Sequence, residues 1–205
     1  MLLLYSSNLF IFSGAVWGGL LGSSMLLIST FLFDNKKNFL LSGFFMALAV
    51  SSFYQIAIFY FFYLIFSSAK LSDMFKFIIG SIPVIGLLML YHYIFTGSPF
   101  TPLYKFEYAD QFSAMKSSMG FSYPRPEVIW ELIFGQYRGL LFYSPALFYL
   151  FYINGGYKLN VLVKSKSFLS CLSYLLLISS FFLWSGGCSH GSRYMLPVLA
   201  LILYK

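Results

Sequence analysis

Residues 77–96 read FIIGSIPVIGLLMLYHYIFT, a run of twenty residues that contains no Asp, Glu, Lys or Arg. Wound as an α-helix, which rises 1.5 Å per residue, this run is about 30 Å long, the thickness of the hydrocarbon core of a bilayer. The stretch therefore predicts a membrane-spanning helix.

The chain as a whole has the composition of a membrane protein. Of its 205 residues, 60% are hydrophobic and only 9% are charged, and its mean hydropathy is +0.80. Besides residues 77–96, the apolar segments are 9–33, 38–67, 138–155, 167–185 and 194–204. We therefore expect an all-α, polytopic integral membrane protein, with one membrane domain over residues 1–205 and six or seven helices that span the bilayer fully or in part.

The two terminal segments differ from ordinary spans. No basic residues precede the N-terminal apolar run, as they would in a cleaved signal peptide, so we interpret residues 9–33 as a retained membrane helix. The last segment, 194–204, is too short to cross a bilayer comfortably. We expect it to span only in part.

Residues 38–67 form an apolar segment of about 30 residues, which is too long for one ordinary span at 1.5 Å per residue. Its most polar part is its middle, Ser51-Ser52-Phe53-Tyr54-Gln55. Two short helices, 39–51 and 53–67, that form a tight hairpin would explain both observations. A single long tilted helix is the alternative.

Lysines are concentrated in short loops between the apolar segments. They are Lys36 and Lys37 in loop 34–37, Lys70 and Lys76 in loop 68–76, and Lys158, Lys164 and Lys166 in loop 156–166. With the hairpin, these loops lie on one side of the membrane, which the positive-inside rule makes cytoplasmic. Residues 97–137 then form a long extracytoplasmic loop that shares its face with loop 186–193. We attribute the net charge of +7 to loop lysines that orient the protein in the membrane. We therefore expect no nucleic-acid partner.

Four of the six carboxylates lie in or beside the long outer loop: Glu107, Asp110, Glu127 and Glu131. Polar residues that gather in one part of a membrane protein usually mark a ligand site. Within the loop, residues 126–134 predict a short amphipathic helix in the plane of the interface, with Pro126 at its first position. The loop is either a lid over a site at the membrane surface or a solvated connection whose charges balance.

Arginine and glycine residues border the two outer loops. Arg138 stands at the edge of an apolar run, where it can snorkel toward the headgroups or hold a lipid phosphate with two hydrogen bonds. In the second loop, Gly187 and Gly191 let the backbone approach a ligand, and Arg193 adds a permanent charge beside them. Together these features are what a phosphate at the bilayer surface requires, although a flexible hairpin would have the same composition.

Histidines and cysteines give little indication of catalysis or metal binding. His190 is either a proton shuttle or a hydrogen-bonded loop residue, and we expect His92, in an apolar helix, to be satisfied by a neighbouring helix. We expect Cys171 to be a packed thiol. No metal-ligand spacing is present, so we predict no metal and no cofactor.

Several of these motifs resemble bacterial membrane proteins of the GT-C glycosyltransferase superfamily, in particular the protein-mannosyltransferase and lipid A aminoarabinose transferase branch. The resemblance covers about residues 38–200. It is carried by GSPF at 97–100, GQYRGLL at 135–141 with YSP at 143–145, a W-x-G-G-x-x-x-G-x-R-Y-x-L-P motif at 184–197, and a helix-hairpin segment at 40–54.

This resemblance implies a multi-pass protein of the bacterial inner membrane with an extracytoplasmic active site. It also implies a polyprenyl-phosphate-linked sugar as donor, and inversion at the sugar carbon with a carboxylate as general base. Arg193 and Arg138, with Gly187 and Gly191, match positions expected near the lipid phosphate. The residues expected to face the substrate are Tyr104, Glu107, Asp110 and His190.

The chain departs from the family pattern in one respect. The family's catalytic acid lies in the first outer loop, whereas no acidic residue precedes Asp34 here, and Asp34 falls on the predicted cytoplasmic side. We therefore expect a fragment or a shortened form, and the catalytic residue stays unknown. The alternatives are a multi-pass transporter or lipid flippase, and a non-catalytic membrane scaffold.

Overall fold

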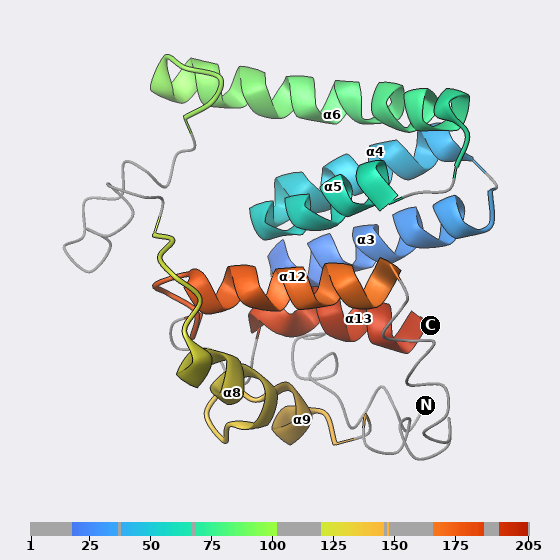
Figure 1. The fold of residues 1–205 in the computed structure, drawn as a ribbon. Coiled ribbons are helices and arrows are strands. Elements are labelled where there is room, and N and C mark those ends of the chain that lie inside the picture. Colours follow the sequence, from blue (N-terminus) through green and yellow to red (C-terminus); the bar gives the residue numbers. More distant parts are fainter. Residues whose placement is uncertain are drawn as a thin grey trace.

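The computed structural model describes residues 18–36, 38–66, 69–101, 120–145, 147, 166–186 and 193–204, and these residues are helical with connecting turns (Figure 1). The longer helices are α3 (Gly18–Asp34), α4 (Phe39–Ser52), α5 (Ala57–Phe66), α6 (Leu71–Thr96), α8 (Pro126–Phe134), α12 (Lys166–Ser180) and α13 (Leu196–Tyr204). The short ones are η1 (Tyr54–Ile56), α9 (Leu140–Tyr143) and η5 (Arg193–Met195). Within this part of the chain, pairing of the strand type is limited to one antiparallel bridge between Phe121 and Phe181, so the predicted all-α class is confirmed.

The long helices run side by side in layers, with α4 packed between α3 and α6 (Figure 1). Helix α13 packs against α3, and α12 packs against α5. The α3–α4 turn and the start of α6 lie at one end of these layers, whereas the end of α12 and helix α8 lie at the other. Lys36 in the α3–α4 turn and Lys70 before α6 therefore lie at one end of the layers. The motifs at 135–141 and 184–197 adjoin α8 and the end of α12 at the opposite end.

A helix break divides residues 38–67. Helix α4 begins after Asn38, whose side-chain Oδ1 accepts a hydrogen bond from the backbone N–H of Leu41 (3.0 Å), as an N-cap does. At Phe53 the backbone is extended, with φ −154° and ψ 94°. The chain then reverses through η1 into α5 (Figure 1), which is the hairpin arrangement and not the single tilted helix.

Helix α6 begins at Leu71, six residues before the predicted apolar stretch. The charged residues Asp73 and Lys76 lie in its first turns and form an ion pair of 3.2 Å on its surface, so they extend the helix without burial of a charge. Among the described residues, α6 is the one helix long and apolar enough to cross a membrane, and the other apolar helices are shorter.

One predicted helix is interrupted in the structure, and another ends earlier than predicted. The predicted helix 138–155 is interrupted at Ser144, because Pro145 disfavours helical geometry in the residue before it and has no N–H of its own; residues 148–165 lie outside the described part. Helix α12 ends at Ser180 and not at 185. Backbone and side-chain groups of residues 120–125 bind its last carbonyls, and this replaces a further helical turn.

Buried serines join α3 to α4. The Ser29 hydroxyl donates to the backbone oxygen of Ser42 (2.9 Å), and the Ser42 hydroxyl donates to the backbone oxygen of Ser29 (2.8 Å). Both side chains are fully buried. Such interhelical hydrogen bonds fix which faces of two apolar helices meet.

Substitution of Ser42 by alanine is expected to lower the free energy of unfolding by about 1 kcal/mol, the usual net contribution of one intramolecular hydrogen bond. The control is Ser24→Ala, because the exposed Ser24 hydroxyl bonds to the Leu20 oxygen of its own helix. Thermal unfolding in detergent would measure both. Equal midpoints for the two variants would contradict a joining role for the serines.

Candidate functional site

The two polar motifs meet at one end of the helix layers. Tyr137, from the GQYRG motif that follows α8, has its ring 6.3 Å from the ring of Trp184, with an angle of 83° between the planes. This edge-to-face geometry is a favourable arrangement for two aromatic rings. The contact joins segments nearly fifty positions apart in the sequence, at the end of the molecule where α8 and the end of α12 lie (Figure 1).

Residues 120–125 anchor the start of α8 to the end of α12. Arg125 donates from Nη2 to the backbone oxygen of Phe181 (2.9 Å), and the N–H of Ser122 donates to the backbone oxygen of Ser180 (2.8 Å). Gly120, at φ 77°, accepts a hydrogen bond from the N–H of Phe182 (2.8 Å). Arg125 therefore donates hydrogen bonds to carbonyls at the C-terminal end of α12. Its positive charge is also favourable at a helix C-terminus.

Two glycines and a glutamate shape the turn that carries Arg138. A Cβ at Gly135 would overlap the Glu131 carboxylate, and one at Gly139 would overlap the backbone of Gly135. The space left by Gly135 lets the Glu131 carboxylate accept a hydrogen bond from the N–H of Tyr137 (3.1 Å). Glu131 thus orients the residue that contacts Trp184.

The Arg138 side chain is almost completely buried, with 2% of its surface exposed. Its guanidinium carbon lies 4.4 Å from the centre of the Tyr137 ring, and Nη2 donates to the Tyr137 hydroxyl (3.2 Å). Cation–π contact with an aromatic face stabilises a buried guanidinium. In this structure the Arg138 guanidinium is therefore held inside the protein, against the Tyr137 ring.

Gly186 provides the space in which the Arg193 side chain lies. Its φ of 72° is in the left-handed region, which favours glycine. A Cβ at this position would come within 2.8 Å of Arg193 Nε and 3.2 Å of Cδ. The first glycine of the W-x-G-G motif is therefore required both by its backbone angle and by the approach of the arginine.

The ring of Tyr194 holds Arg193 against the helix layers. The Arg193 guanidinium carbon lies 5.3 Å from the centre of this ring. The Tyr194 ring also stacks on the Phe53 ring, with centroids 5.5 Å apart. The Tyr194 backbone oxygen accepts a hydrogen bond from the Tyr174 hydroxyl (2.7 Å). The hairpin break at Phe53 thus supports the arginine-bearing segment.

Only part of the predicted site is described. Arg138 and Arg193 belong to two motifs that are in contact. The Tyr137 ring of the first motif meets the Trp184 ring of the second, and within the second motif Arg193 lies beside Gly186. The other predicted site residues, Tyr104, Glu107, Asp110, Gly187, His190 and Gly191, lie outside the described residues. In the part that is described, no group of three or more His, Cys, Asp or Glu side chains could hold a metal ion.

The roles of two residues at the site were not foreseen from the sequence, where Glu131 was named only among the outer carboxylates. Both side chains form hydrogen bonds with backbone groups. Arg125 donates to carbonyls that are distant in sequence, and Glu131 accepts from the N–H of Tyr137. The pairing of Glu131 with a glycine four positions later is the one local signal for its role. His92, by contrast, has the partner that the sequence led us to expect: its Nε2 lies 3.1 Å from the Tyr54 hydroxyl of the preceding hairpin.

Comparison of the chain with protein-family models, curated proteins and solved structures gives no match. The resemblance to GT-C glycosyltransferases therefore stays a prediction that rests on the sequence motifs.

Proposed function

We propose that the chain is a GT-C-like membrane glycosyltransferase, or a part of one, that binds a polyprenyl-phosphate-linked sugar and transfers the sugar to an extracytoplasmic acceptor. The observation that carries the proposal is the linked set of contacts from Arg138 through Tyr137 and Trp184 to Gly186 and Arg193. Two motifs that are far apart in the sequence meet there, and each brings an arginine.

A membrane location is part of the proposal, and the surface of α6 supports it. Large apolar side chains stand exposed along the whole helix, among them Ile82, Leu87 and Ile94. A core helix of a water-soluble protein would be mostly covered, whereas a lipid-facing helix carries such a surface. We propose the bacterial inner membrane, with the Arg138 end outside and the lysine-bearing end in the cytoplasm.

The chemistry proposed for the arginines is stabilisation of the leaving group. In an inverting transfer, the acceptor oxygen bonds to the sugar carbon while the bond from that carbon to the phosphate oxygen breaks. The lipid phosphate leaves with the bonding electrons, and fixed guanidinium groups offset its developing charge. A carboxylate takes the acceptor's proton, and no residue of this chain is assigned to that step.

The direct test is an assay of sugar transfer by the full-length gene product in membranes, with a radiolabelled polyprenyl-phosphate sugar as donor. We expect label to move to an acceptor and free polyprenyl phosphate to accumulate. Uptake of donor into vesicles without transfer would favour the transporter alternative. Binding without transfer or uptake would favour a non-catalytic scaffold.

The proposed orientation has its own test in single-cysteine variants labelled from either side of the membrane. A cysteine at position 110 or 189 is expected to react with an impermeant reagent from outside, and a cysteine at position 36 only after the membrane is opened. Reaction of positions 110 and 189 from opposite sides would exclude one shared site.

A further inference from the structure

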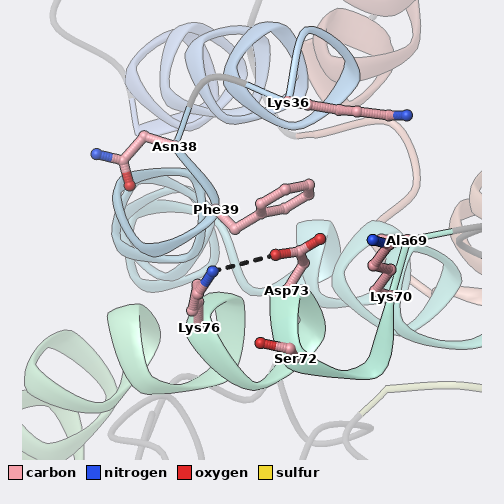
Figure 2. Close-up of a pocket in the computed structure, with 8 residues that line it drawn as sticks. All are labelled: Lys36, Asn38, Phe39, Ala69, Lys70, Ser72, Asp73 and Lys76. Atoms are coloured by element: carbon pink, nitrogen blue, oxygen red, sulfur yellow. Dashed lines mark hydrogen bonds and ion pairs between the residues drawn. The ribbon is translucent and has the colours of Figure 1, made fainter.

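A polar cavity lies at the opposite end of the molecule from Arg138 and Arg193. It has a volume of about 750 Å³ and is formed where the α3–α4 turn faces the start of α6. Lys36 and Asn38 come from the turn, and Lys70, Asp73 and Lys76 come from the start of α6 (Figure 2). No residue of the proposed transferase site lines it.

The charge of this cavity is positive. Three lysines and one aspartate line it, which leaves a net charge of +2 when the ion pair between Asp73 and Lys76 (3.2 Å) is counted as neutral. Lys36 and Lys70 are exposed and supply the remaining charge. The cavity also adjoins the first turn of α6, whose N-cap residue Lys70 makes no side-chain capping bond. Backbone N–H groups at a helix N-terminus favour an anion.

Exposed apolar side chains stand next in sequence to residues that line the cavity, Leu71 beside Lys70 and Phe75 beside Lys76. Leu71 and Phe75 project from the first turns of α6 with 71% and 57% of their surfaces exposed, and Ile65, near the end of α5, is 69% exposed. Leu71 and Phe75 are four residues apart and share one face of the helix. A ligand with both an anionic head and apolar chains would match this surface, whereas a free anion would use only the lysines.

We propose that this cavity binds the phosphate-bearing headgroup of an anionic phospholipid, with the acyl chains lying against the apolar residues of α5 and α6. Lys36 and Lys70 provide the attraction, and Asp73 limits it by neutralising Lys76. Basic pockets between helices at a membrane surface are suited to such headgroups. The proposal shares the membrane setting with the proposed function but uses none of its residues.

The test is native mass spectrometry of the full chain, purified in a mild detergent and titrated with phosphatidylglycerol or with zwitterionic phosphatidylcholine. We expect wild type to bind one phosphatidylglycerol in clear preference to phosphatidylcholine. Loss of each lysine should weaken that preference roughly five-fold, so Lys36→Gln with Lys70→Gln should nearly abolish it. The matched Lys36→Arg with Lys70→Arg variant keeps both charges and should retain the preference.

Two further arms decide between sources of phosphate and guard against misfolding. Asp73→Asn should tighten phosphatidylglycerol binding several-fold, a gain that a misfolded protein would not show. Inorganic phosphate at the same concentration should fail to displace the lipid. Unchanged preference in the double glutamine variant, or full displacement by inorganic phosphate, would overturn the proposal.

Discussion

Replacement of Gly43 by valine is expected to separate α4 from α6 and to leave little folded protein. A Cβ at Gly43 would overlap the backbone oxygen of Phe77, and a Cβ at Gly80 would overlap that of Leu40. The two helices thus cross with backbone against backbone at a pair of glycines, as small residues allow in membrane helices. Because backbone cannot rotate away as a side chain can, the two helices would have to separate.

The expected cost is about 3 kcal/mol or more, at or beyond the upper end for overpacked cores. This is a large fraction of the stability of a small domain. The measurement is the yield of monodisperse protein and its thermal midpoint in detergent.

Gly86 of α6, the helix against which Gly43 packs, provides the control. A Cβ built there meets nothing within 4 Å, so Gly86→Ala should be neutral or stabilising by up to about 1 kcal/mol through helix propensity alone. Wild-type yield and midpoint for Gly43→Val would show that α4 and α6 do not cross as described.

The helices themselves could be predicted from the sequence, but their exact ends could not. Apolar runs in the sequence predicted α3, α4, α5 and α6, because a helix that is buried or in contact with lipid needs apolar side chains. The start of α6 was missed since Asp73 and Lys76 look like loop residues, although an exposed ion pair is compatible with a helix. The end of α12 was missed because its carbonyls bind Arg125, a partner far away in the sequence.

The arginines of the candidate site could also be named from the sequence, whereas the means of holding them could not. Gly186 and Arg193 belong to one motif, so their proximity is local. The contact between Tyr137 and Trp184 and the role of Glu131 depend on how α8 packs against α12. Side-chain periodicity carries no information about such a packing, which only the three-dimensional arrangement reveals.

The crossing of α4 and α6 is a similar case. Gly43 is the one glycine of α4, whereas α6 contains both Gly80 and Gly86, and no spacing within either helix indicates that Gly43 and Gly80 meet. Glycine is needed at each position because the backbone of the other helix packs against it. The same crossing brings the α3–α4 turn against the start of α6 and so creates the lysine-lined cavity (Figure 2). A variant that separates the helices should therefore also lose any lipid bound there.

Substitution of Arg193 by alanine is expected to abolish binding of the polyprenyl-phosphate donor while the fold persists. The side chain lies against Gly186 and over the Tyr194 ring, and alanine would remove its charge without adding volume. Charge-assisted hydrogen bonds to phosphate are among the strongest single contacts in proteins, and loss of about 3 kcal/mol weakens binding more than a hundred-fold.

Arg125→Ala is the matched control for Arg193→Ala, because Arg125 lies at the same end of the molecule but is engaged with the backbone oxygens of Ser179 and Phe181. Its loss should lower the thermal midpoint and leave donor affinity nearly unchanged, while Arg193→Lys should retain part of the affinity through its charge. Equilibrium binding of a fluorescent polyprenyl-phosphate sugar to each variant in detergent would measure both effects. Wild-type affinity in Arg193→Ala would remove Arg193 from the donor site, and an equal loss in Arg125→Ala would mean that the site responds to any damage at this end of the helices.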